Sequence, residues 1–169
     1  PEYLTGAEAI AFRVGRNTSV ESMVLSAWGR QLDIYARTGT AALGLVAPTP
    51  ILHRLRLRKE PHELERLREA CRISSEAHEL ARSITRPGMN EAEVQAAMEA
   101  HFRSNGARGP AYGSIVAGGD NACVLHYTAN TAQLQDGDLL LIDAGCSLED
   151  YYNGDITRTF PVNGRFTAE

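Results

Sequence analysis

The chain has 169 residues, of which 43% are hydrophobic and 22% charged, and its formal net charge is −4. This composition excludes a disordered tail, a collagen-like chain and a disulfide-dense miniprotein. The sequence has no apolar run of about 18 residues, so we expect no membrane-spanning helix. Three cysteines without a CxxC pair favour a reducing, cytoplasmic setting over a disulfide framework.

The charge is unevenly distributed along the chain. Residues 53–86 hold nine basic and six acidic side chains, whereas residues 87–169 hold four basic and eleven acidic ones. Because charges of opposite sign alternate in the basic stretch, we interpret it as the solvated face of a helix and expect no nucleic-acid partner. The acidic C-terminal half favours binding of cations over binding of polyanions.

The N-terminal third carries weak secondary-structure signals. Apolar residues at helical spacing predict a helix over residues 21–37, and a short apolar run predicts a strand within residues 41–47. The Pro-Thr-Pro segment 48–50 interrupts this pattern and predicts a linker. We therefore expect one domain over residues 1–52 and another over residues 53–169.

Two amphipathic helices are predicted next. Pro61 suits the first turn of a helix, and apolar residues recur every three or four positions through residues 61–86. Asn90 and Glu93 have the spacing of a capping box, which predicts the start of a second helix.

From residue 111 the periodicity changes to that of strands. Residues 111–117 and 123–127 predict two short strands. Residues 139–142 are apolar on both faces and predict a buried strand, and residues 154–160 predict a further one. Two helices followed by several strands indicate an α+β fold.

Two aspartates are the main candidates for chemistry. Asp143 ends the predicted buried strand, where an unpaired carboxylate is costly. Asp155 shares one predicted strand face with Thr157 and Thr159, whose hydroxyls could orient it. If the chain reverses between them, the two carboxylates meet, and a shared divalent cation such as Mn²⁺ relieves their repulsion. The alternative is that backbone N–H groups satisfy each carboxylate separately.

His126 is the third candidate residue. It follows two apolar residues, so the pattern alone allows either a buried, hydrogen-bonded histidine or a catalytic one. The sequence contains no GxxxxGK[ST], GxGxxG, HExxH or GxSxG motif, which excludes the common phosphate-binding, zinc-protease and serine-hydrolase signatures.

Three ordered segments of the sequence resemble Xaa-Pro aminopeptidase, also called aminopeptidase P. They are NACVLHYTAN at residues 121–130, DGDLLLIDAGC at residues 136–146 and GDITRTFPVNG at residues 154–164. The resemblance extends from about residue 53 to residue 169. It implies a pita-bread fold, in which two similar α+β halves surround a dinuclear metal site that usually holds manganese.

The resemblance assigns expected roles to the candidate residues. By analogy, Asp143 would bind one metal ion and Asp155 would bridge both. His126 would contact the substrate or stabilise the tetrahedral intermediate, and Tyr112 would line the substrate site. Residues 53–169 would form the first half of the pita-bread catalytic domain, preceded by the end of an α/β N-terminal domain.

The implied activity is metal-dependent release of the N-terminal residue from peptides with proline in the second position. The apolar stripe of the helix over residues 61–86 and the strand edges would normally be covered by the second half, so we expect self-association into a homo-oligomer, and we expect no membrane partner. The interval between the two aspartates is one residue longer than the family pattern, which implies an insertion in the hairpin. The remaining ligands of the family, a histidine and two glutamates, belong to the second half of the domain. We therefore expect a fragment that is inactive alone.

Three alternatives stay open. Prolidase, which cleaves Xaa-Pro dipeptides, shares the histidine and aspartate motifs. Non-catalytic pita-bread proteins bind histones or nucleic acid and usually lack the metal ligands, and creatinase is a metal-free relative. The presence of Asp143, Asp155 and His126 argues against these last two, although the fold alone would not separate them.

Overall fold

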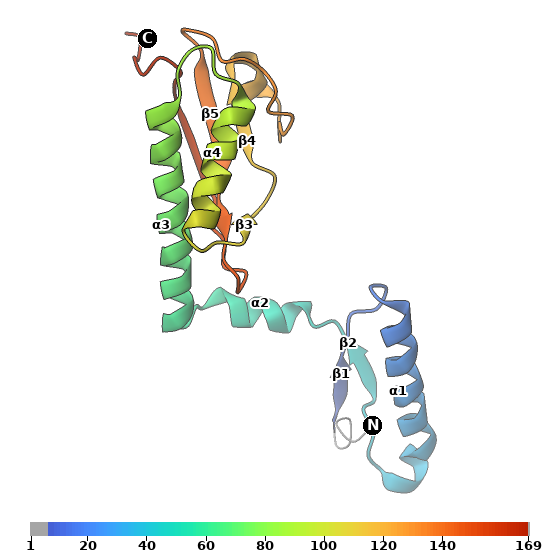
Figure 1. Ribbon diagram of the computed structural model, residues 1–169. Coiled ribbons are helices and arrows are strands. Elements are labelled where there is room, and N and C mark those ends of the chain that lie inside the picture. The colour runs from blue at the N-terminus through green and yellow to red at the C-terminus, as the bar shows by residue number, and fades with distance from the viewer. Residues whose placement is uncertain (1–6, 169) are drawn as a thin grey trace. The chain divides into compact units, whose positions relative to one another are not determined.

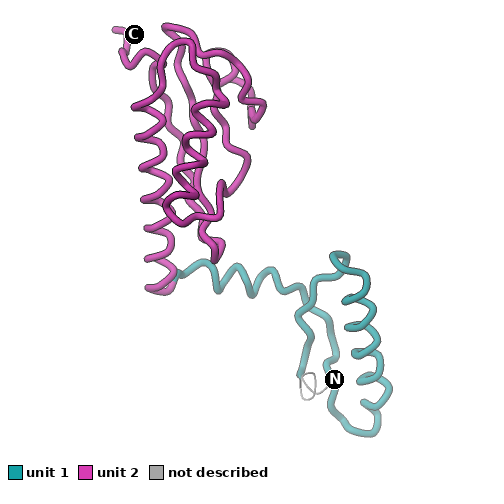
Figure 2. Tube along the Cα trace, in the orientation of Figure 1, with its two compact units in different colours: residues 1–59 teal, residues 60–169 magenta. Residues whose placement is uncertain are grey.

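A computed structural model describes residues 7–168 of the chain (Figure 1). The chain forms two compact units that divide between Lys59 and Glu60 (Figure 2). Helix α2 (Thr49–Leu57) covers the position where we expected the boundary. The Pro-Thr-Pro segment therefore begins a helix rather than forming a linker, because proline is well tolerated in a first turn. The assignment of the first unit to the end of an N-terminal domain stays a prediction.

The first unit is a pair of parallel strands joined by a long helix. β1 (Ala9–Ala11) and β2 (Gly44–Val46) pair in parallel, and α1 (Thr18–Thr38) connects them. Asn17 caps α1 by accepting a hydrogen bond from the backbone N–H of Val20 (3.1 Å). The predicted helix and strand of this region are confirmed. No residue of α1 is buried, so this unit by itself buries little apolar surface.

The second unit begins with two helices. α3 (Pro61–Ile84) and α4 (Glu91–Ser104) pack against each other and against one face of a sheet (Figure 1). The predicted capping box of Asn90 and Glu93 is present. Arg72 pairs with acidic residues one turn before and after it on the exposed face of α3, which confirms that the basic stretch is a solvated helix face.

Two antiparallel ladders follow the helices. The main sheet has the order β4 (Ile115–Gly118), β5 (Leu139–Ala144), β7 (Ile156–Pro161). A second ladder pairs β3 (Gly109–Pro110) with β6 (Cys146–Ser147). Helices followed by an antiparallel sheet confirm the predicted α+β class.

Two of the predicted strands differ from the structure. Residues 123–127 are not a strand, because the chain forms a 3₁₀ helix, η2 (Gly119–Cys123), and then a turn in which the N–H of Tyr127 donates to the carbonyl of Val124 (3.2 Å). These local hydrogen bonds replace a ladder. Residues 111–117 become a strand only at Ile115, where pairing with β5 begins.

The sheet is covered by helices on one face. Leu140 and Ile142 are fully buried on that face, whereas Leu139 is 50% exposed. The prediction that this strand is buried on both faces is therefore wrong within the described residues, and Asp143 lies on the face opposite the helices. The core between helices and sheet contains mainly these apolar side chains: Ile73, Ala77, Val94, Met98, Phe102, Val116, Leu140, Ile142 and Phe160.

Candidate active site

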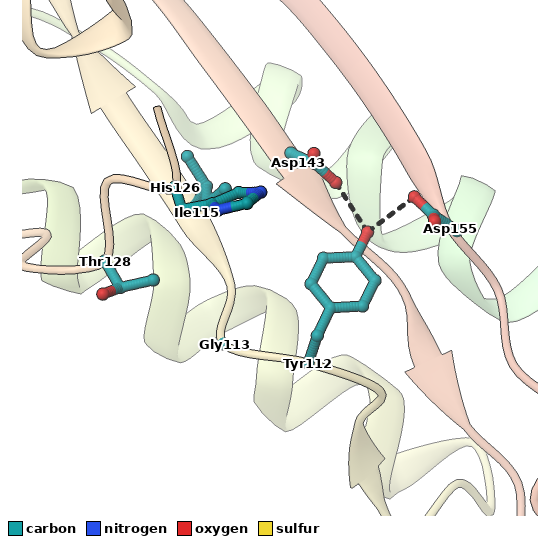
Figure 3. Close-up of a pocket in the computed structure, with 7 residues that line it drawn as sticks. All are labelled: Tyr112, Gly113, Ile115, His126, Thr128, Asp143 and Asp155. Atoms are coloured by element: carbon teal, nitrogen blue, oxygen red, sulfur yellow. Dashed lines mark hydrogen bonds between the residues drawn. The ribbon is translucent and has the colours of Figure 1, made fainter. Parts of the chain in front are cut away.

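The strand register brings the two aspartates together. Asp143 lies in β5 opposite Thr157 of β7, and Asp155 directly precedes β7. Both carboxylates lie within hydrogen-bonding distance of the Tyr112 hydroxyl, at 2.6 Å for Asp143 Oδ1 and 3.0 Å for Asp155 Oδ1 (Figure 3). Within residues 7–168 the hydrogen bonds to these carboxylates come from Tyr112 and not from backbone amides. The two aspartates thus converge as predicted, and metal binding by them stays a prediction.

Close backbone packing fixes the hairpin between the aspartates. The N–H of Gly154 donates to the carbonyl of Cys146 (2.9 Å). A Cβ on Gly145 would overlap the carbonyl oxygen of Gly154, and a Cβ on Gly154 would overlap Ser74 Oγ of α3. Ser74 Oγ in turn accepts from the N–H of Cys146 (3.0 Å). The positions of the aspartates therefore depend mainly on backbone contacts that exclude larger residues.

Tyr112 offers one proton to two carboxylates. Burial, and after it the hydrogen bonds to both aspartates, raises the pKa of the Tyr112 phenol, so this hydroxyl stays protonated at neutral pH. A single O–H donates to one carboxylate at a time, and the other carboxylate oxygen then faces the hydroxyl without a proton between them. Two carboxylates around one donor leave an excess of negative charge that a cation would neutralise.

His126 reaches the same site from the loop after η2. Together with Tyr112, Asp143 and Asp155, it lines a cavity of about 380 Å³, completed by Gly113, Ile115 and Thr128 (Figure 3). The side chain is exposed, which excludes the alternative of a buried core histidine. Its φ of 55° lies in the left-handed region, which non-glycine residues seldom adopt. Such a conformation persists only where surrounding contacts hold it in place.

The side chains of this cavity suit part of a metal site. Carboxylate oxygens are ligands for hard or borderline divalent ions, and the excess negative charge around Tyr112 fits a cation. Within residues 7–168, no group of three or more His, Cys, Asp or Glu side chains is arranged to hold a metal ion. Cys146 is fully buried and its thiol donates to the carbonyl of Ala70, so it is a packed core residue. The described residues thus offer two ligands, and a complete site needs more.

Two buried polar residues of the site region were missed by the sequence analysis. Glu91, the first residue of α4, is fully buried and accepts hydrogen bonds from the segment that carries His126. Asn130 is 1% exposed; its Oδ1 accepts from Val116 N (3.0 Å), and its Nδ2 donates to Gln95 Oε1 (2.8 Å) and to the carbonyl of Ser114 (2.7 Å). A glutamate after an N-cap and an asparagine in a loop are common on surfaces, so neither carried a signal.

A histidine of α3 holds the end of β5 from the helix side. His78 is buried, and its Nε2 donates to the carbonyl of Ala144 (3.0 Å), the residue after Asp143. Its Nδ1 is buried without a hydrogen-bond partner in the described chain. Burial lowers the pKa of His78, so the neutral tautomer with hydrogen on Nε2 fits this position.

Comparison with known proteins assigns the chain to a class. Residues 65–169 match metallopeptidase family M24, and the chain belongs to that family. This match covers all of the residues that line the cavity around Asp143 and Asp155.

Similar proteins within the family include Xaa-Pro aminopeptidases. The chain is 40% identical over 166 residues to Xaa-Pro aminopeptidase from Escherichia coli (strain K12), which covers 98% of this chain and 37% of that protein. It is 50% identical over 118 residues to Xaa-Pro aminopeptidase from Haemophilus influenzae, which covers 70% of this chain and 27% of that protein. The chain therefore spans less than two fifths of the length of these relatives.

Solved structures agree with this assignment over nearly the whole chain. Proline aminopeptidase P II from Yersinia pestis superimposes with a TM-score of 0.86 at 42% identity, covering 98% of this chain and 38% of that one. Pseudomonas aeruginosa aminopeptidase PepP superimposes with a TM-score of 0.87 at 40% identity, over 99% and 38% of the two chains. The second unit is thus part of an M24 catalytic domain. Among residues 7–168, no helix is long and apolar enough to cross a membrane.

Proposed function

We propose that the protein releases the N-terminal residue from peptides with proline in the second position, with two divalent metal ions bound partly by Asp143 and Asp155. The observation that carries this proposal is the convergence of both aspartates on Tyr112 in a cavity that His126 also lines. Relatives named Xaa-Pro aminopeptidase at 40–50% identity support the substrate class. A neighbouring structure described as zinc-substituted aminopeptidase P in complex with product supports divalent ions, and we propose manganese as the natural one.

The residues of this chain would divide the work as follows. Asp143 would hold one ion and Asp155 would bridge both, and bound divalent ions supply Lewis acidity and a water of lowered pKa. The Tyr112 hydroxyl would hold one aspartate oxygen in place and leave the others free for metal. His126 would donate a hydrogen bond to the carbonyl oxygen of the scissile peptide as negative charge develops there.

The principal test uses the full-length protein and a peptide such as Ala-Pro-Ala. We expect release of alanine, loss of activity with a chelator and recovery with Mn²⁺. The dipeptide Ala-Pro distinguishes prolidase from Xaa-Pro aminopeptidase. A protein that cleaves Ala-Pro but not Ala-Pro-Ala would be a prolidase, which would replace our proposal. If the protein neither cleaves these substrates nor binds Mn²⁺ in calorimetry, it is a non-catalytic member of the fold. The 169-residue chain alone should be inactive because residues 7–168 bring only two carboxylates together in the cavity.

Substitution of one ligand tests the metal assignment directly. Asp155→Asn should weaken Mn²⁺ binding and lower kcat by about 100-fold or more, since loss of a ligand should exceed the effect of losing an outer-shell partner. Asp150→Asn is the matched control, because Asp150 lies in the same hairpin and forms an exposed ion pair with Arg66 (2.7 Å). Equal Mn²⁺ affinity in the two variants would exclude Asp155 as a ligand.

We also propose a cytoplasmic homo-oligomer without nucleic-acid or membrane partners. The three cysteines are unpaired, and Cys71 and Cys123 are exposed, which supports a reducing environment. Light scattering of the full-length protein tests the oligomeric state, and a monomer would contradict it.

A further inference from the structure

Glu91 is a buried carboxylate to which the proposed chemistry assigns no role. Its side chain is fully buried and accepts four hydrogen bonds. Oε1 accepts from Gly118 N (2.8 Å) and Asn121 Nδ2 (3.0 Å). Oε2 accepts from the hydroxyl of Tyr127 (2.8 Å) and from Ala132 N (2.9 Å). A buried carboxylate that accepts this many hydrogen bonds holds the donor groups firmly in position.

The electrostatics keep Glu91 ionised. Burial raises the pKa of the Glu91 carboxyl. The hydrogen bonds from Gly118, Asn121, Ala132 and Tyr127 together lower the pKa by more than burial raises it, so the net shift is downward. Glu91 is also the first residue of α4, where the helix dipole favours negative charge. All four donors therefore face a charged acceptor, and their hydrogen bonds are stronger than neutral ones.

The four donors lie on both sides of His126 in the sequence. Gly118 and Asn121 precede it, and Tyr127 and Ala132 follow it. Asn121 Nδ2 also donates to the Tyr127 hydroxyl (3.1 Å), which joins the two arms directly. One carboxylate thus closes the base of the loop formed by residues 118–132.

Apart from Glu91, side-chain hydrogen bonds to this loop come from Asn130, described above, and from Asn90 Nδ2, which donates to the carbonyl of Thr131 (2.7 Å). The tip of the loop is exposed, with Leu125 at 85% and Val124 at 54% exposure. The His126 ring has no hydrogen-bond partner among residues 7–168, and its backbone is in the left-handed region. A rarely adopted conformation at an exposed tip needs a rigid base. The four hydrogen bonds to Glu91 form the part of that base that joins the segments before and after His126.

We propose that Glu91 is a positioning residue that holds His126 at the aspartate pair. This proposal rests on the proposed peptidase function for its effect on catalysis. The positioning itself is a property of residues 118–132 and is measurable without activity. Glu91 is the first residue of α4 and does not line the cavity, so it affects His126 through the loop and does not contact the substrate.

The test uses Glu91→Gln in the full-length protein. Whichever way the amide is turned, its NH₂ group meets a backbone N–H, either that of Gly118 or that of Ala132. Glu93→Gln is the matched control, because it makes the same chemical change two residues away and a glutamine still completes the capping box with Asn90. His126→Ala and the double variant Glu91→Gln/His126→Ala complete a thermodynamic cycle.

The expected kinetic result is a loss that depends on His126. Glu91→Gln should lower kcat about tenfold, with KM and Mn²⁺ affinity changed less than about threefold, since misplacement of a reacting group mainly affects the transition state. In the His126→Ala background, Glu91→Gln should lower kcat by less than about twofold. A loss of similar size in both backgrounds would overturn the proposal, as would a kcat for Glu91→Gln equal to that of Glu93→Gln.

Amide hydrogen exchange gives a readout that does not need activity. Glu91→Gln should accelerate exchange in residues 118–132 and leave α3 unchanged. If the wild-type protein does not cleave Xaa-Pro peptides, the proposed function fails while this result still supports the positioning role. Unchanged exchange in residues 118–132 overturns the positioning role whatever the activity. If Glu91→Gln does not fold, Tyr127→Phe removes one of the four hydrogen bonds and should give the same local acceleration, smaller in size.

Discussion

The two halves of the candidate site are held in place by different means. Asp143 and Asp155 are set by strand pairing and by backbone contacts in which Gly145 and Gly154 leave no room for a side chain. His126 lies on a loop whose backbone and side chains donate hydrogen bonds to Glu91. Backbone ladders are insensitive to most single side chains, whereas a buried polar network depends on each member.

This difference predicts two patterns of mutational sensitivity. Changes in the hairpin between the aspartates should affect folding and metal binding together. Changes in the network under the loop should affect turnover while metal binding persists. The following variants test that separation, from the largest expected effect to the smallest.

Gly145→Ala should cause the largest loss. The new Cβ would overlap the carbonyl oxygen of Gly154, and backbone atoms on both sides of the hairpin cannot move without breaking the strand register. We expect the free energy of unfolding to fall by about 3 kcal/mol or more, measured by chemical denaturation, with Mn²⁺ binding lost in parallel. Gly29→Ala is the control, because nothing lies within 4 Å of its new Cβ in α1, and it should be neutral or stabilising. A stable Gly145→Ala variant with normal Mn²⁺ binding would contradict the backbone account.

Asn130→Ala should have an intermediate effect confined to the loop. It removes three buried hydrogen bonds and leaves the N–H of Val116 without a partner. It also places alanine at a φ of 48°, which asparagine tolerates better. We expect a loss of about 2 kcal/mol in unfolding free energy and a lower kcat, with Mn²⁺ affinity retained. Asn163→Ala, at an exposed position, should change stability by less than about 0.5 kcal/mol. Loss of Mn²⁺ binding in Asn130→Ala would show that the aspartate hairpin and the loop that carries His126 do not respond independently to mutation.

Acidification should lower the free energy of unfolding through protonation of His78, which supports the end of β5 that carries Asp143. The pKa of His78 is lowered in the folded state, so the unfolded chain binds more protons once the pH falls below the ordinary histidine value of about 6.5. Stability should be constant above that pH and decline below it, by at most about 1.4 kcal/mol for each pH unit. Denaturation curves measured from pH 7.5 to pH 5 should show this decline in the wild type and a smaller one in His78→Gln. His53→Gln, at an exposed position, should keep the wild-type profile; an unchanged profile in His78→Gln would exclude His78 as the source.

The sequence predicted the regular elements well because their signals are local. Capping residues and apolar spacing located α3 and α4. The strand register places Thr157 opposite Asp143, whereas Asp155 directly precedes β7, so its place on a strand face stays a prediction. The strand predicted over residues 123–127 is wrong because a short apolar and aromatic run is compatible with a strand or a turn, and only tertiary contacts distinguish the two.

The support of the site could not be predicted in the same way. The partners of Glu91 lie 27 to 41 positions away in the sequence, and no spacing rule links a helix start to a distant loop. The contact of Tyr112 with both aspartates depends on an irregular segment between β3 and β4, for which periodicity gives no information. Here the resemblance to a family identified Tyr112 as a candidate, and the structure supplied its contacts.

The closure of the aspartate hairpin has a practical consequence. Below its tip, the bond from Gly154 to Cys146 locks the two arms together, whereas Glu149, Asp150 and Tyr151 are exposed. The insertion that the resemblance implies in this hairpin stays a prediction, and an added residue at the exposed tip would lie outside the region that this hydrogen bond closes. The same tip is therefore a suitable place to insert a short epitope or a fluorophore-labelling tag for following the protein.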